Sequence, residues 1–557
     1  MKLILVLLAV ALTAISLAST PTVDMIQLEN NWQYPIFYAS KLPPTYYIAT
    51  AYLTVLAILS KDRRLKLMSV LLIALLSELT PSIMLKNPWL LDQYPYLAEA
   101  TWLVKTGYIA PVHYLDQLPG LGSMFSQLML ITGLGPIEIS KLYPCIVVSA
   151  VVIPMFLISE KICRDGALVP LLFLATNFAQ INIFHRATYF FMLFSVLMLL
   201  LVEKVARERA NRSIAILCVL VFSAACITYP GSGMIIIALS VLLILNAFLA
   251  RVAGRAVKHR IEIMLLIFVV IFFAWSIYVA QAEFAHWIVS NIYNIFTEFS
   301  PLSVPPISQI KPEVLGLTPI FDTIILVRLG MVFLVLCLAS ISALYIIWTK
   351  RNFQLFIALL YAGFMVLTAP FIVTFGAQWV ILKFTWYIMF TAAACICIGV
   401  TYGRFGRIMR LIVLVTILVG LLSVPLLRYA SIPYLNIPTE ELRAVEFIDT
   451  RYNSTELIYC IEYPPYLLHR IQMDKDIYWD IESWPTNTQI NTSYNYLTSQ
   501  RLLTRDGFYV RYVGSYKAYL DSQIAILETT HNLVYTSDPY IKLFIHTTNV
   551  NESGTSR

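Results

Sequence analysis

Long apolar runs without charged residues alternate with short polar segments over the first three quarters of the chain. A transmembrane helix needs roughly 20 mostly apolar residues, because the hydrocarbon core of a bilayer is about 30 Å thick. The pattern therefore predicts an α-helical polytopic membrane domain over residues 1–427, with about 13 spans. The predicted spans are 3–18, 44–60, 67–85, 139–159, 167–183, 189–202, 213–228, 233–250, 261–281, 322–348, 353–375, 379–402 and 408–427.

The positions of Lys and Arg predict how these spans are oriented. Every second short loop is rich in basic residues, and the loops between them hold only isolated ones. Because basic loops stay on the cytoplasmic side, the loops between them are predicted to be external. We expect a multi-pass protein of the cell (plasma) membrane. Residue 20 is then outside, whether the first run is a span or a cleaved signal peptide. The basic loops are 61–66, 160–166, 203–212, 251–260, 349–352 and 403–410.

The composition changes abruptly after the last predicted span. Residues 428–557 are polar and rich in Tyr, and they contain no apolar run long enough to cross a membrane. Short β-like runs such as "ELIYCIEY" and "YIKLFIHTT" occur together with helical patterns such as "TEELRAVEFIDTRY". We therefore predict a small external α/β domain over 428–557, in which we find no catalytic motif.

The overall composition agrees with a lipid environment. Hydrophobic residues make up 59% of the chain, charged residues 13%, and the mean hydropathy is +0.75. The net charge of +7 reflects orientation in the bilayer, so we infer no nucleic-acid partner from it. Cys460 is the only cysteine in the C-terminal region, which excludes a disulfide within that region.

The external segment between the third and fourth predicted spans, residues 86–138, is neither an ordinary loop nor a span. Its part 92–106 has the pattern of an amphipathic helix at a membrane interface, with Glu99 away from the apolar face. A second apolar part, 121–134, is too short to span comfortably, and a span there would reverse the sidedness of every later loop. We interpret it as interfacial or re-entrant.

Several residues of this segment resemble a known family, the GT-C superfamily of integral-membrane glycosyltransferases. Its members include protein mannosyltransferases, aminoarabinose transferases and the catalytic subunits of oligosaccharyltransferase. The resemblance implies transfer of a sugar from a polyprenyl-phosphate donor to a lipid, glycan or protein acceptor at the external face. It also implies that an acidic residue of this loop is the catalytic base. The matching residues are Asp92, Tyr96, Ala100, Gly107, Tyr114 and Pro119-Gly120, followed by "LITGL" and "KLYP".

Sugar transfer needs a base that takes a proton from the acceptor hydroxyl. Asp92 lies where a span meets the predicted interfacial helix, so we predict that it is this base. An N-cap carboxylate is the structural alternative, and both roles are compatible. Asp116 and Glu99 are secondary acidic candidates, for which a solvated loop and a polar helix face are the simpler explanations.

The departing phosphate needs cationic or hydrogen-bonding groups at the depth of the lipid headgroups. Arg186, in the short external turn "FHRATY", and Lys383, at the start of a predicted span, are the first candidates, with His185 and Tyr96 beside them. Basic residues at span ends are also ordinary snorkelling anchors.

Arg328 is a further cationic candidate, about two turns inside the outer end of its predicted span. A charge at that depth needs a partner, and Glu78 is a candidate for a purely structural ion pair with it. The turn "YPGSG" at 229–233 either presents backbone N–H groups to an anion or simply separates two helices.

Two features of metal-using members of the family are missing. A second acidic motif in a later external loop and a "WWDYG" motif in the C-terminal domain do not occur. We therefore predict no cofactor, with a divalent metal as the open alternative, and we place a metal-independent monosaccharide transferase ahead of an oligosaccharyltransferase-like enzyme. The second long external loop predicted in this chain, 282–320, is the feature that keeps the latter as an alternative. The alternatives from other classes are a transporter or lipid flippase and a non-catalytic scaffold.

Overall fold

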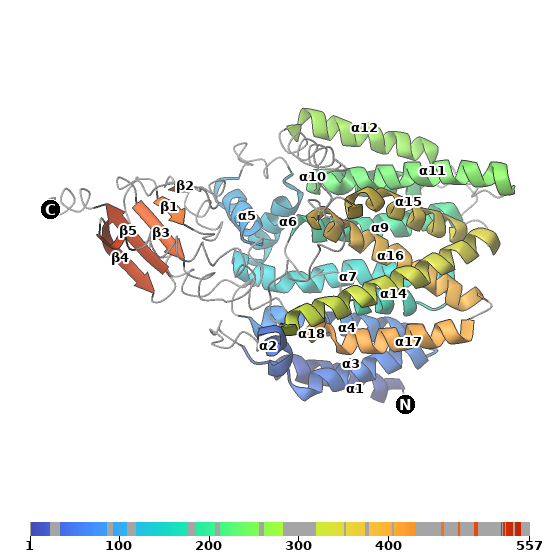
Figure 1. Ribbon diagram of the computed structural model, residues 1–557, viewed down its shortest axis with the longest axis horizontal. Helices are drawn as coiled ribbons and strands as arrows, with labels where there is room; N and C mark the ends of the chain where they lie inside the picture. The colour runs from blue at the N-terminus through green and yellow to red at the C-terminus, as the bar shows by residue number, and fades with distance from the viewer. Residues whose placement is uncertain are drawn as a thin grey trace.

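The protein is a bundle of long helices with a small β-sheet near its C-terminus (Figure 1). The computed structural model describes residues 2–22, 34–85, 93–107, 118–176, 185–206, 212–254, 261–281, 319–349, 353–373, 378–403 and 406–428, and short segments between 458 and 546.

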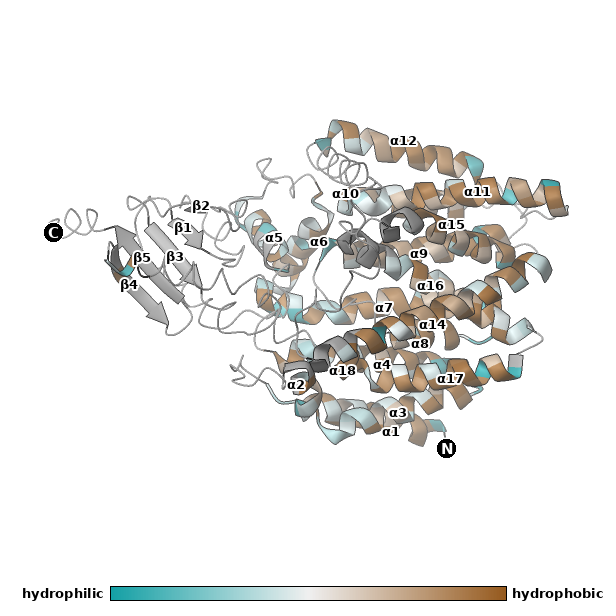
Figure 2. Cartoon of the chain, in the orientation of Figure 1, coloured by the Kyte–Doolittle hydropathy of each residue, from teal (hydrophilic) through white to brown (hydrophobic). Residues whose placement is uncertain are grey.

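The helices follow the apolar runs of the sequence, and their hydrophobic residues dominate the bundle (Figure 2). The first half contains α1 (Lys2–Ala18), α2 (Tyr34–Lys41), α3 (Pro44–Leu59), α4 (Arg63–Met84), α5 (Tyr94–Thr106), α6 (Gly120–Thr132), α7 (Pro136–Cys163), α8 (Leu168–Ala175) and α9 (Arg186–Ala206). The second half contains α10 (Arg212–Thr228), the 3-10 turn η4 (Pro230–Ser232), α11 (Gly233–Ala253), α12 (Glu262–Tyr278), α14 (Pro319–Thr349), α15 (Phe353–Val373), α16 (Gln378–Tyr402), α17 (Gly406–Leu422) and α18 (Val424–Leu427).

Six helices in the described part of the chain are long and apolar enough to cross a membrane, judged by length and composition. They comprise α4, α7, α9, the η4–α11 segment, and most of α14 and α16, and several shorter apolar helices lie beside them. The predicted total of about 13 spans stays a prediction. The run 408–427, predicted as one span, is two helices, because Pro425 has no N–H to continue the helical ladder.

The central helix of the bundle is α16. Its residues from Tyr387 to Ile398 are buried on every side of the helix. A helix that is apolar all round belongs in the middle of a bundle. By contrast, α12 and α14 expose large apolar side chains such as Ile263 and Phe333, as expected of helices that face lipid.

Three of the predicted cytoplasmic loops meet at one end of the bundle. Lys66, in the first turn of α4, forms an ion pair of 2.8 Å with Asp165, and Arg63 forms one of 2.7 Å with Glu160. Lys161 likewise pairs with Glu203 at the end of α9. These contacts join the loops 61–66 and 160–166 and the segment beginning at 203, which agrees with their predicted location on one side.

The C-terminal sheet has five strands in the order β2-β1-β3-β5-β4. The strand β1 runs parallel to both neighbours, whereas β5 is antiparallel to β3 and β4. Both runs that the sequence predicted as β-like form strands, β1 and β5. The predicted helix over 439–452 lies outside the described residues, and the boundary at 428 and the external location stay predictions. The strands are β1 (Ile458–Ile461), β2 (Ile477–Tyr478), β3 (Asn495–Ser499), β4 (His531–Ser537) and β5 (Ile541–His546).

Candidate functional site

Three of the predicted site residues, Tyr96, His185 and Arg186, lie together. The hydroxyl of Tyr96 on α5 is 3.2 Å from Nε2 of His185, and the two rings meet edge to face at a centroid distance of 5.0 Å. The guanidinium carbon of Arg186 lies 5.1 Å from the centroid of the Tyr96 ring. The helix α5, from the first predicted external loop, thus contacts the start of α9.

The hydrogen bonds of His185 indicate which ring nitrogen carries the proton. The backbone N–H of Ala187 donates to Nδ1 of His185 at 2.9 Å, so Nδ1 is an acceptor. In a neutral imidazole the proton is then on Nε2, which donates to the Tyr96 hydroxyl oxygen. That hydroxyl keeps its own proton for a second acceptor.

Arg186 is the first residue of α9, and it is only 2% exposed. A cation at this position opposes the helix dipole, whose positive end is the N-terminus, so helix stability does not account for it. The Tyr96 ring partly stabilises the guanidinium through a cation–π contact. The buried guanidinium and the helix N-terminus together create a strongly electropositive position, suited to a phosphate.

A second layer of hydrogen bonds fixes the start of α9. The hydroxyl of Thr188 donates to the carbonyl oxygen of His185 at 2.7 Å. Because that proton is used, the hydroxyl of Tyr143 on α7 is the donor in its 2.9 Å bond to Thr188. Tyr143 is fully buried, so α7 anchors the backbone that carries His185 and Arg186.

The sequence pattern predicted that Glu99 lies on a polar helix face, but the structure buries it. It is 3% exposed, and its carboxylate lies against Gly122 of α6, where a Cβ atom would be 2.7 Å from Cδ and Oε1. The residue at 122 therefore has to be small. The prediction was wrong because α6 covers this side of α5, and a helical pattern does not reveal such a neighbour.

Other predicted site residues lie wholly or partly outside the described residues. Asp92 and Asp116, the first acidic candidate and a secondary one, are among them, and so is Tyr114. Lys383 falls in the second turn of α16, but its side chain is outside the described part. Their predicted roles stay predictions.

Glu78 forms a buried ion pair with Arg428, at the end of α18, a residue that the sequence reasoning missed. Arg428 also lies close enough to Arg328 for their charges to interact. Glu78 and Arg428 thus form a second buried polar site, and the partly exposed Arg328 lies near it. Arg428 is the first residue of the predicted external domain, 428–557. It therefore lies outside every predicted span, and the sequence pattern did not mark it as a membrane residue.

The turn at 229–233 is a buried packing element. Pro230, Gly231 and Ser232 form η4 and are all buried, and the Tyr229 ring contacts the ring of Phe190 on α9 at 5.5 Å. These contacts favour the role of a helix separator over exposed N–H groups.

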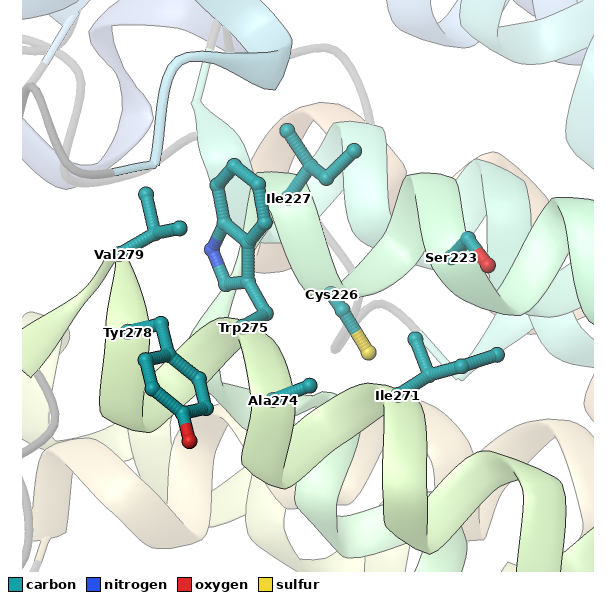
Figure 3. A pocket seen from close by; sticks show the side chains of 8 residues that line it. All are labelled: Ser223, Cys226, Ile227, Ile271, Ala274, Trp275, Tyr278 and Val279. Carbon is teal, nitrogen blue, oxygen red and sulfur yellow. The ribbon is translucent and has the colours of Figure 1, made fainter.

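An apolar pocket of about 430 Å³ lies between α10 and α12 (Figure 3). None of the predicted site residues lines it. Among the described residues, no group of three or more His, Cys, Asp or Glu side chains is arranged to hold a metal ion. The pocket is lined by Ser223, Cys226, Ile227, Ile271, Ala274, Trp275, Tyr278 and Val279.

Comparison with known proteins gives a likeness in fold. No family model matches the chain, and no curated protein matches it. A crystal structure of ArnT from Cupriavidus metallidurans bound to undecaprenyl phosphate is similar over 86% of this chain and 96% of that one, with 11% sequence identity and a TM-score of 0.50. The apo structure of the same protein matches over 81% and 93%, with 12% identity and a TM-score of 0.43. The first likeness confirms the predicted GT-C-like membrane fold, and at this identity it speaks for the fold alone.

Proposed function

We propose that this protein is a membrane glycosyltransferase of the GT-C type. It moves a sugar from a polyprenyl-phosphate carrier to a lipid, glycan or protein acceptor on the external face of the cell membrane. The observation that carries the proposal is the buried guanidinium of Arg186 at the N-terminus of α9, held against Tyr96. The fold is shared with ArnT, whose crystal structure contains undecaprenyl phosphate, and this supports a polyprenyl-phosphate partner.

The proposed reaction is a direct displacement at the anomeric carbon. The carboxylate of Asp92 takes the proton of the acceptor hydroxyl while the acceptor oxygen forms the new bond to this carbon. The bond from the anomeric carbon to the phosphate oxygen breaks, and the polyprenyl phosphate leaves with the bonding electron pair. One displacement inverts the anomeric configuration.

The chain's own residues stabilise the leaving phosphate in this proposal. Arg186 supplies charge and paired N–H donors, and the hydroxyl of Tyr96 supplies a donor oriented by His185. Lys383 adds a second cation from α16. Burial strengthens the interactions of Arg186 and Tyr96, because the local dielectric constant is lower than in water.

The test is transfer by the purified protein in liposomes that contain polyprenyl-phosphate sugars, with the Asp92→Asn variant at matched expression and folding. We expect glycosylated product from the wild type and a loss of at least roughly 100-fold in the variant. Unchanged turnover in Asp92→Asn would remove Asp92 from the mechanism. Movement of the lipid-linked sugar across the bilayer without any product would instead identify a flippase.

A further inference from the structure

Helix α8 ends inside the bundle. Its eight residues extend for about 12 Å, less than half of a hydrocarbon core of about 30 Å. Its last residue, Ala175, packs against Gly420 of α17 so closely that a Cβ atom at 420 would be 2.3 Å from the Ala175 carbonyl oxygen. The carbonyl groups at the C-terminal end of α8 are therefore in the protein interior, where they need partners.

Arg428 supplies one of these partners. Its Nη2 donates to the carbonyl oxygen of Leu174 at 2.6 Å, while its Nη1 pairs with the carboxylate of Glu78 on α4. The side chains of Arg428 and Glu78 are 1% and 0% exposed. A cation at the C-terminal end of a helix is favoured by the helix dipole. One side chain thus ties together α4, the end of α8 and the segment that follows α17.

The end of α8 also supports the start of α9. The ring of Phe173, next to Leu174, stacks on the ring of Phe191 with a centroid distance of 5.5 Å and an interplanar angle of 16°. Phe191 lies within the first two turns of α9, which begins at Arg186. A shift of the end of α8 therefore displaces the turns that carry the candidate phosphate-binding residue.

We propose that Arg428 is a positioning residue for the candidate site, acting through the end of α8 and the Phe173–Phe191 contact on the start of α9. This inference rests on the proposed function as far as its kinetic consequence is concerned. A purely structural ion pair would stabilise the bundle without changing the KM of the folded protein for its polyprenyl-phosphate sugar donor. The two roles therefore make different predictions.

The decisive variant is Arg428→Lys. A single ammonium group keeps the charge opposite Glu78 but cannot reproduce the fork that also reaches the Leu174 carbonyl. The double variant Arg428→Met with Glu78→Leu removes both charges together and guards against misfolding caused by one unpaired buried charge. Arg410→Lys is the matched control, since Arg410 is an exposed arginine on α17.

Two measurements on the full-length protein test the inference. Hydrogen–deuterium exchange should become faster at the amides of 186–191 in Arg428→Lys but not in Arg410→Lys. In transfer assays, the KM for a polyprenyl-phosphate sugar should rise by roughly tenfold in Arg428→Lys with a smaller change in kcat. The double variant should show both effects.

Unchanged exchange at the start of α9 would overturn the inference. Faster exchange with an unchanged KM would also overturn it, because Arg428 would then support α9 without acting on the site. If the wild type transfers no sugar at all, the proposed function fails, and the exchange comparison still decides whether Arg428 positions α9.

Discussion

The hydroxyl of Tyr96 lies 3.2 Å from Nε2 of His185, although 89 positions separate the two residues in the chain. This contact joins α5, a helix of the first predicted external loop, to the start of α9. It also brings the Tyr96 ring beneath the guanidinium of Arg186. The proposed roles of Tyr96 and Arg186 can be tested by substitution.

Tyr96→Phe removes the hydroxyl but keeps the ring below Arg186. We expect sugar transfer to slow by about five- to tenfold, since one hydrogen bond contributes roughly 1 kcal/mol. Initial rates with a polyprenyl-phosphate sugar would measure it. Tyr52→Phe is the matched control, because it removes a hydroxyl that donates to the Leu5 carbonyl, between α3 and α1. Equal rates for wild type and Tyr96→Phe would exclude a role for the hydroxyl.

Arg186→Gln should weaken donor binding by about 10- to 100-fold, because a charge-assisted hydrogen bond contributes roughly 1.5–3 kcal/mol. Arg186→Lys keeps the charge and loses the planar fork, so its defect should be smaller. The KM for the donor is the measurement. Arg251→Gln, at an exposed arginine in the last turn of α11, serves as the control. If Arg186→Gln binds its donor like the wild type, Arg186 is only an anchor.

Gly122→Ala should destabilise the protein by about 1–3 kcal/mol, the usual cost of overpacking. The new methyl group would lie 2.7 Å from the Glu99 carboxyl carbon, so the buried Glu99 side chain or the two helices have to shift. Thermal unfolding in detergent would measure the loss. The control is Gly330→Ala in α14, where nothing lies within 4 Å of the new atom and the helix gains up to about 1 kcal/mol. Equal melting temperatures for both variants would contradict the close packing.

Acidification should weaken the contact of Asp62 with Lys2. The hydrogen bond from Lys2, followed by the backbone N–H groups of Leu65 and Arg64, lowers the pKa of Asp62. Because the pKa in the folded protein is below the unfolded value of about 3.9, the stabilisation is present above that pH and disappears as the pH falls through the folded pKa.

Melting temperatures of the wild type and Lys2→Gln should therefore differ slightly at neutral pH and converge in acid. A difference that persists at the lowest pH would show that the stabilising effect of Lys2 does not depend on the charge of Asp62. Lys2 is largely exposed and Asp62 partly exposed, so high salt should also reduce the difference.

Much of the helical architecture was predictable, because spacing and apolarity are local properties of the chain. The predicted run 44–60 is α3, and the predicted interfacial segments 92–106 and 121–134 correspond to the helices α5 and α6. Long-range contacts were not predictable. The sequence suggested Arg328 as a partner of Glu78, but it gave no sign of the contact between Glu78 and Arg428, 350 positions away.

The burial of Glu99 shows the same limit. The helical pattern of α5 indicates which side chains share a face, but it does not indicate which faces a second helix covers. Gly122 was the available signal, because a glycine inside an apolar helix often marks a close approach.

The sequence by itself determined that the chain is a polytopic membrane protein, since the apolar run length must match the bilayer, and it singled out Tyr96, His185 and Arg186. Only the tertiary structure decided that these three residues meet, that Glu99 is buried and that Arg428 reaches the end of α8. The physical reason is that hydrophobic periodicity is encoded residue by residue. A buried polar contact, by contrast, depends on how distant helices pack, and it forms only where the whole bundle brings its two partners within hydrogen-bonding distance.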